Sequence, residues 1–262
     1  AVSVNTTSAT ISDDLAVGGD IITTSAGTSN VRVGVSAGSS IESGGNHNVA
    51  VGNEAGTAIT TGDGNIVIGF ESGHDITTGG YNLLIGWKAG DKIDTASQNV
   101  AIGDGSLSAD TKGSKSVAVG SNTLNTQNFT SATDSYNTAV GYNAGVSVTT
   151  GINNTLIGGL AGDAITTGFS NSLVGKFSGS ALTDADYNVA MGQQSLAQDT
   201  QGSASVAIGS FALGTQNFTS ATDSYNTAVG YAAGSAITTG IYNNLVGSLT
   251  GDALTDADSN VA

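Results

Sequence analysis

The 262-residue chain contains no cysteine and no proline, and aromatic residues make up only 5% of it. The absence of cysteine excludes disulfides, zinc–thiolate sites and cysteine catalysis, and it leaves the redox compartment open. The apolar residues are mostly Ala, Val, Ile and Leu, which suit short strands but give little bulk for a thick core. The composition therefore argues against an ordinary globular domain and favours regular, repetitive packing.

Basic residues are also scarce, because 6 Lys and Arg against 21 Asp and Glu give a formal net charge of -15. An acidic surface repels phosphate backbones and anionic lipids, so we expect no nucleic-acid partner. No apolar run is long enough to span a bilayer, so we expect no membrane insertion by this segment. The chain starts at Ala1 without Met or a signal-peptide pattern and stops within a repeat, which indicates a processed or partial piece of a longer protein.

What the chain has in abundance is glycine, at 39 residues, and internal repetition. One residue, usually Asn, precedes each apolar triplet, and its spacing is 17 residues, interrupted twice by 21. The aligned residues are Asn48, Asn65, Asn82, Asn99, Ser116, Asn137, Asn154, Asn171, Asn188, Ser205, Asn226, Asn243 and Asn260. Four steps of 17 and one of 21 make a super-repeat of 89 residues, and a shift by 89 maps residues 126–142 onto 215–231 without a mismatch. Such a period is the signature of a repeat architecture.

The repeat boundaries divide the chain into five parts. We expect an N-terminal extension or cap, looser solenoid coils, two super-repeats and a partial third super-repeat that continues beyond this segment. The corresponding residues are 1–13, 14–47, 48–136, 137–225 and 226–262.

Each unit predicts one coil of an all-β, parallel β-solenoid. An apolar segment of about four residues is expected to form a strand, and the glycine that ends it, such as Gly52 or Gly69, is never replaced. A second extended piece, residues 58–61, is expected to end at Gly62. No unit holds ten residues of helical periodicity, so helical repeats are excluded. The Asn column and the Thr pairs, such as Thr60 and Thr61, are interpreted as structural ladders.

The strand is apolar on both faces. The third residue after the Asn is always Val, Ile or Met, and the residue before it is always Ala, Leu or Val. Adjacent strand residues point to opposite faces, so one column fills the coil and the other needs a cover. The simplest cover is another copy of the chain, which predicts a homo-oligomer.

The repeats resemble a known group of fibre proteins. Units such as 137–145 (NTAVGYNAG) and 226–234 (NTAVGYAAG), followed by Thr-Thr-Gly, are similar to the tandem repeats of phage and viral tail fibres and of large bacterial surface proteins. More distantly, residues 116–120 (SVAVG) and 205–209 (SVAIG) resemble the left-handed β-roll heads of trimeric autotransporter adhesins. The resemblance covers residues 48–262 well and 14–47 loosely, and the 17-residue coil is longer than the adhesin coil.

Both families are homotrimeric fibres, so the resemblance implies three chains side by side. It implies a structural shaft of an extracellular or virion fibre, such as a tail fibre or a bacterial surface appendage, that supports attachment to a host cell or surface. One alternative is an adhesin whose solenoid itself binds host glycans or matrix proteins. A β-helical polysaccharide-degrading enzyme is the third candidate, and it requires a clustered pair of acids.

No residue pattern predicts a catalytic, cofactor or metal site, so we do not expect an enzyme. His47 and His74, the only histidines, lie in different units at different offsets, and we expect neither to have an acidic partner at ligand spacing. Asp184 and Asp186 fall in a corner, where Asp suits turns, and nothing singles them out as a catalytic pair.

The 21-residue units hold the best candidates for recognition. Their insertions bring in the aromatic residues Phe129, Tyr136, Phe218 and Tyr225. These residues are expected either to brace a wider corner or to form a repeated knob that contacts sugar or protein. Near each insertion, Leu replaces the glycine found at the ninth position of other units, as at Leu107 and Leu196, and we expect this Leu to fill the same interior volume. The sequence thus predicts a widened coil about every five coils, at the insertion with Phe129 and again at the insertion with Phe218. We call each widened coil a collar.

Overall fold

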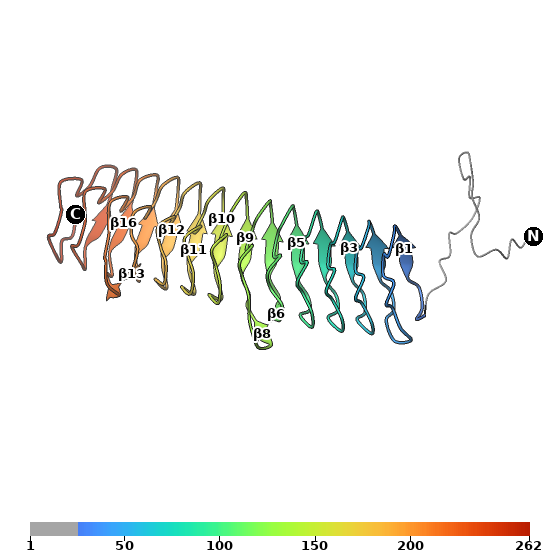
Figure 1. Ribbon diagram of the computed structural model, residues 1–262. Helices are drawn as coiled ribbons and strands as arrows, with labels where there is room; N and C mark the ends of the chain where they lie inside the picture. Colours follow the sequence, from blue (N-terminus) through green and yellow to red (C-terminus); the bar gives the residue numbers. More distant parts are fainter. Residues whose placement is uncertain (1–25) are drawn as a thin grey trace, which may run out of the picture.

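The structure, a computed structural model, describes residues 26–262 and forms a parallel β-solenoid. Its main sheet has 13 parallel strands, one per coil, and runs along the whole row of coils (Figure 1). The described residues contain no helix. The predicted all-β solenoid is therefore confirmed from residue 31 onward, whereas the expectations for residues 1–13 and 14–25 lie outside the described part of the chain.

Most strands are three residues long. Those of the main sheet are β1 (Val31–Val33), β2 (Val49–Val51), β3 (Ile66–Ile68), β4 (Leu83–Ile85), β5 (Val100–Ile102), β7 (Val117–Val119), β9 (Thr138–Val140), β10 (Thr155–Ile157), β11 (Ser172–Val174), β12 (Val189–Met191), β14 (Val206–Ile208), β16 (Thr227–Val229) and β17 (Asn244–Val246). Two further sheets have two short strands each: β6 (Gly113–Ser114) with β8 (Thr133–Asp134), and β13 (Gly202–Ser203) with β15 (Thr222–Asp223).

The register follows the sequence repeat. Equivalent residues pair directly, as Ala50 does with Val67, so one coil takes 17 residues. The pairing of Val117 with Thr138 gives a 21-residue coil between β7 and β9. The extra residues form a loop that projects from the solenoid beside β6 and β8 (Figure 1). The predicted collars are thus present, and each has its own small sheet.

The second strand expected in each coil is absent from the ordinary coils. Residues 58–61 form turns and bends, because the N–H of Ile59 donates to the carbonyl of Gly56 at 3.2 Å and curves the chain. The coils still bond to each other here, since Thr60 donates its N–H to Thr77 O at 2.9 Å and its Oγ1 to the same oxygen at 3.1 Å. The threonine ladder therefore exists without strand geometry.

The core is one continuous cluster of side chains inside the coils. The middle residue of every main-sheet strand after β1 points inward and is fully buried, as at Val67 and Leu84. Leu107, Leu124, Leu196 and Leu213 are also fully buried, which confirms that leucine fills the interior where other coils have glycine. The leucine compensates for an aliphatic side chain that these coils lack at the later corner site, where Asp110 and Gln127 stand in place of Ile93. A Cβ at Gly90 would lie 2.8 Å from Leu84 Cδ1.

The glycine after each strand is required for two reasons. At Gly69 the backbone has φ +134°, which L side chains rarely adopt, and a Cβ there would overlap the carbonyl oxygen of Gly86 in the next coil. Gly62 at the second corner needs no positive φ, but a Cβ would overlap the carbonyl oxygen of Gly79. Close approach of successive coils therefore excludes a side chain at Gly69 and at Gly62, although the second-corner column takes alanine at Ala96 and Ala185.

The Asn column is a buried ladder that links backbone to side chain. Each Oδ1 accepts the backbone N–H of the next Asn, as from Asn65 N to Asn48 Oδ1 at 2.9 Å. Each Nδ2 donates to a corner carbonyl, as from Asn65 to Gly79 O at 2.9 Å. These amides are at most 3% exposed from Asn30 to Asn243, so the ladder satisfies backbone groups that water cannot reach.

Candidate functional site

The outward face of the main sheet carries a continuous row of aliphatic side chains. The third residue of each strand points out of the coil, and in every coil it is Val, Ile or Met. Val33, Ile157, Met191 and Val246 are 55%, 39%, 44% and 66% exposed. In most other coils the third residue is half-buried, as at Ile68 and Val119. An accessible apolar stripe that follows a whole sheet is uncommon on a soluble monomer and marks a surface of interaction.

The stripe is wider at the N-terminal end of the row. From β1 to β7 the first strand residue is also aliphatic, as at Ile66, which is 38% exposed. In β9, β10 and β11 that residue is Thr or Ser. Exposed aromatic residues directly follow the corner glycine in several coils, and Phe70 stacks on Trp87 with ring centroids 6.4 Å apart. The first half of the solenoid therefore presents the larger apolar surface.

The collar aromatics separate into two environments. Phe129 and Phe218 are both only 6% exposed, whereas Tyr136 and Tyr225 are 54% and 49% exposed. The Phe129 ring closes over Gly113, where an added Cβ would lie 2.6 Å from Phe129 Cδ2. The burial of the phenylalanines is what a brace requires, and the exposure of the tyrosines is what a contact requires.

A buried polar network lies behind each phenylalanine. Asp110 Oδ1 accepts the N–H of Gly113 at 2.9 Å, and its Oδ2 accepts Gln127 Nε2 at 2.6 Å. Gln127 also donates to Ser116 Oγ at 2.9 Å and accepts Asn137 Nδ2 at 2.8 Å. The ladder loses an amide where Ser116 stands in the Asn column, and two residues take over its contacts: Gln127 accepts the Asn137 side-chain amide, and Ser135 Oγ accepts the Asn137 backbone N–H at 3.5 Å. Burial raises the pKa of Asp110, partly offset by the hydrogen bonds from Gln127 and Gly113.

The second collar repeats this network with the same residue types. Asp199 accepts Gln216 Nε2 and the Gly202 N–H, and Gln216 also bonds Ser205 and Asn226. Sequence analysis missed both networks. The signal was the coincidence of Asp110 in place of an aliphatic residue in one unit with Ser116 in place of Asn and Gln127 in the next unit.

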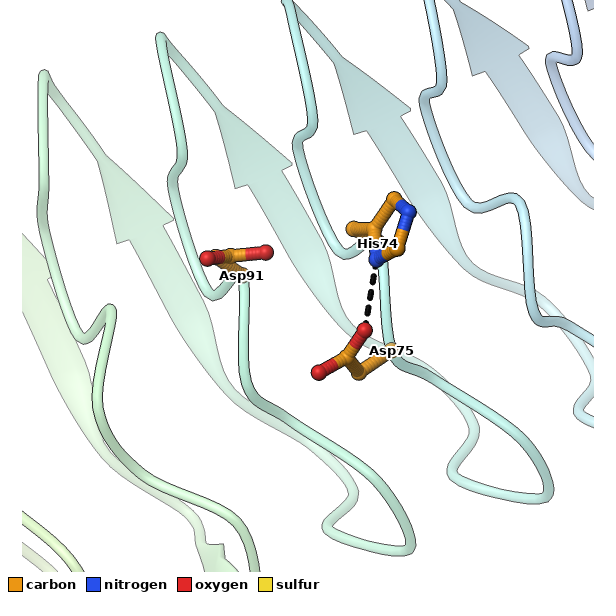
Figure 2. Close-up of side chains that lie close together, drawn as sticks. All are labelled: His74, Asp75 and Asp91. Carbon is orange, nitrogen blue, oxygen red and sulfur yellow. Dashed lines mark hydrogen bonds and ion pairs between the residues drawn. The ribbon is translucent and has the colours of Figure 1, made fainter.

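His74, Asp75 and Asp91 form the one group among the described residues with metal-ligand geometry (Figure 2). Their donor atoms all lie within 4.8 Å of one another, and His74 Nδ1 lies 2.5 Å from Asp75 Oδ1. The expectation that His74 has no acidic partner is therefore wrong. Asp91 stands 17 residues after His74, so the two residues lie at the same position of successive coils. This one-coil spacing is the sequence signal that predicts their contact.

The cluster already contains a positive charge. Lys92 Nζ lies 3.0 Å from Asp75 Oδ2 and 3.5 Å from Asp91 Oδ2. Burial raises the pKa of Asp91, whereas for Asp75 the hydrogen bonds from His74 and Lys92 outweigh burial and lower the pKa. A metal ion would have to displace the lysine ammonium, so we describe the cluster as an ion-paired group. His47 is exposed and lies outside it.

The corner carboxylates have a structural role. Asp186 Oδ1 accepts the N–H of Phe169 in the preceding coil at 2.9 Å. Asp63 and Asp258 make the equivalent bond to Asn46 and Ile241. Asp184, two residues before Asp186, accepts the hydroxyl of Thr183. The Asp184 and Asp186 carboxylates therefore serve turn and coil contacts.

Within residues 26–262 no helix is both long and apolar enough to cross a membrane. Comparison of the chain with family models, with curated proteins and with solved structures finds no match.

Proposed function

We propose that this chain is a shaft segment of an extracellular fibre, a tail fibre or a bacterial surface appendage, that supports attachment to a host cell or surface. In this proposal three copies lie side by side, and each contributes the outward face of its 13-stranded sheet to the shared interior. The role is structural and non-enzymatic.

The observation that supports the proposal is the row of outward Val, Ile and Met side chains. It continues through every coil without a charged residue at the third strand position. Burial of apolar surface contributes about 25 cal/mol per Å², and the contribution adds along the row because each coil presents the same position. The choice of three copies rests on the resemblance of the repeats to trimeric fibre proteins.

Sedimentation equilibrium combined with small-angle X-ray scattering tests the shaft. The proposal predicts a particle of three times the 25.6 kDa chain mass, with the profile of a rod. A stable monomer at micromolar concentration would contradict it.

A second candidate is an adhesin whose solenoid binds host glycans or matrix proteins directly. The exposed Tyr136 and Tyr225, one on each collar, favour it. Binding of the chain to immobilised glycans or matrix proteins, lost in a Tyr136→Ala/Tyr225→Ala variant, would support this candidate over a purely structural shaft.

A further inference from the structure

The second collar contains a notch. It lies on the corner side of the coils, outside the main sheet, and encloses about 210 Å³. Gln194, Gln198, Phe211, Gly214 and Thr215 line it. All of these residues belong to one chain, so the notch is complete without any partner and does not depend on the proposed shaft.

The first super-repeat shows what fills the equivalent place. A shift by 89 maps Gly214 onto Asn125 and Ala197 onto Ser108. Asn125 Nδ2 donates to Gly105 O and to Ser108 Oγ, both at 2.8 Å. In the second super-repeat glycine and alanine remove that side chain and its partner. The notch therefore results from Gly214 and Ala197, which are smaller than their equivalents in the first super-repeat.

Three residues around the notch also differ in type from their equivalents in the first super-repeat. Gln194, Gln198 and Phe211 stand where the first super-repeat has Gly105, Ala109 and Asn122. The Phe211 ring is 38% exposed and is held edge-to-face against Tyr231, with centroids 6.1 Å apart. Among the described residues no hydrogen bond uses the side-chain amide of Gln194 or Gln198. An aromatic ring and two unengaged amides thus meet at one opening.

We propose that this notch binds one neutral sugar ring of a saccharide. The apolar C–H face of a pyranose packs against Phe211, and its hydroxyl groups exchange hydrogen bonds with the amides of Gln194 and Gln198, each of which donates and accepts. The volume is below the roughly 300 Å³ of small ligand pockets, which fits one ring and excludes a buried oligosaccharide.

The lining excludes two other ligand classes. No Asp, Glu, Lys or Arg lines the notch, so a charged ligand would find no opposite charge there, and the net charge of -15 repels anions. A purely apolar ligand would offer no partner to the two glutamine amides, and covering the half-buried Gln194 amide would cost binding free energy. A polyhydroxylated ring with an apolar face satisfies both groups.

Saturation-transfer difference NMR on the full chain tests the proposal, with the methyl glycosides of glucose, galactose, mannose and N-acetylglucosamine as probes. We expect at least one probe to bind weakly, at roughly millimolar Kd. The matched variant is Gly214→Asn/Ala197→Ser, which restores the two residues of the first super-repeat and should fold normally, because the first collar holds the same pair. It should weaken binding at least about tenfold.

Phe211→Asn, which also places the residue of the first super-repeat, should weaken binding to a similar degree. Two results would overturn the proposal: no saturation transfer to any of the four glycosides, or equal transfer to the wild type and to Gly214→Asn/Ala197→Ser. Binding of tyrosine methylamide in the notch, with no glycoside bound, would also overturn it in favour of a peptide side chain.

Discussion

The carboxamide oxygen of Asn48 accepts the backbone N–H of Asn65 at 2.9 Å, and both residues are fully buried. This contact recurs at almost every coil and joins each coil to the next through a side chain as well as through the sheet. A solenoid depends on such nearest-neighbour contacts, because each repeat touches only the repeats beside it.

Replacement of one ladder residue should therefore weaken the whole array. Asn82→Ala leaves the buried N–H of Asn99 and the carbonyl of Ala96 without their partners. Each unsatisfied group costs about 1–3 kcal/mol, so the free energy of unfolding should fall by at least about 2 kcal/mol. Thr78→Ala, at an exposed position in the preceding coil, should stay within about 0.5 kcal/mol of the wild type in the same urea titration.

Serine should not rescue this position. Ser116 occupies the ladder only where Gln127 and Ser135 take over the contacts of the missing amide, and in the coil of Asn82 the position equivalent to Gln127 is Ile93. Asn82→Ser should lower the urea midpoint nearly as much as Asn82→Ala. A midpoint equal to that of the wild type would show that serine needs no such compensation in the ladder.

Two neighbouring glycines should respond in opposite ways to alanine. Gly158 has φ +132°, and a Cβ there would lie 2.6 Å from the carbonyl atoms of Gly175, so Gly158→Ala should lower the melting temperature strongly. Gly159 lacks a positive φ, and its Cβ would approach nothing closer than 4.0 Å. Gly159→Ala should be neutral or slightly stabilising, by up to about 1 kcal/mol, because it restricts the unfolded chain. Similar losses in both variants would contradict the close packing of coils.

Alanine at the buried phenylalanine and at the exposed tyrosine of a collar should lower the free energy of unfolding by different amounts. Phe129→Ala should cost about 3 kcal/mol, since it empties a buried site beside Gly113. Tyr136→Ala should cost less than about 1 kcal/mol, because the ring is exposed and its hydroxyl meets only Lys115 and Asp134 at the surface. The second collar offers an independent repeat of the experiment with Phe218 and Tyr225. A larger effect from tyrosine than from phenylalanine would reverse the assigned roles.

Asp110 predicts a pH dependence of stability. Its pKa is raised in the folded state by burial, so the folded collar holds the proton at a pH where the unfolded chain has released it. Above the raised pKa the carboxyl is ionised in both states, and the folded state bears the full cost of burying the charge. Below the unfolded value near 3.8 it is protonated in both states, and that cost vanishes. Stability should therefore fall, through this group, as pH rises through that window.

The measurement is the urea midpoint of the wild type and of Asp110→Asn between pH 4 and about 7. Other carboxylates with raised pKa values, such as Asp91 and Asp163, contribute the same slope to both proteins, so the difference between the two isolates Asp110. Asp110→Asn should show the smaller loss of stability with rising pH. Identical profiles would mean that Asp110 does not titrate differently on folding.

Much of the fold could be predicted from the sequence because the repeat reports spatial neighbours directly. The 17-residue spacing sets the register, the invariant Gly69 column indicates close coil contact, and Leu107 in place of glycine indicates a conserved interior volume. The second strand was predicted wrongly, because the Thr60 column has strand-forming residues but its backbone is turned by the bond from Ile59 to Gly56.

The sites were harder to predict, because they depend on neighbours across the coils. Asp91 reaches His74, and Gln127 reaches Asp110, only after a shift of one 17-residue coil. The notch at Gly214 depends on the loss of a side chain, and becomes visible only beside Asn125 in the other super-repeat. The sequence also left open which strand column points outward. Leu84 lies inside the coil, so a charge there would unfold the chain, whereas Ile68 lies on the outer face.

The most direct test of the account is sedimentation equilibrium of Ile68→Asp/Ile157→Asp beside the wild type. Both residues lie in the outward column, and the control is Thr78→Asp/Thr167→Asp, which adds the same charge at exposed positions outside the sheet. The account predicts a trimeric wild type and control, and a monomeric Ile68→Asp/Ile157→Asp with an unchanged β-rich circular dichroism spectrum. A monomeric wild type, or a trimer that keeps its mass with aspartate at both positions, would contradict it.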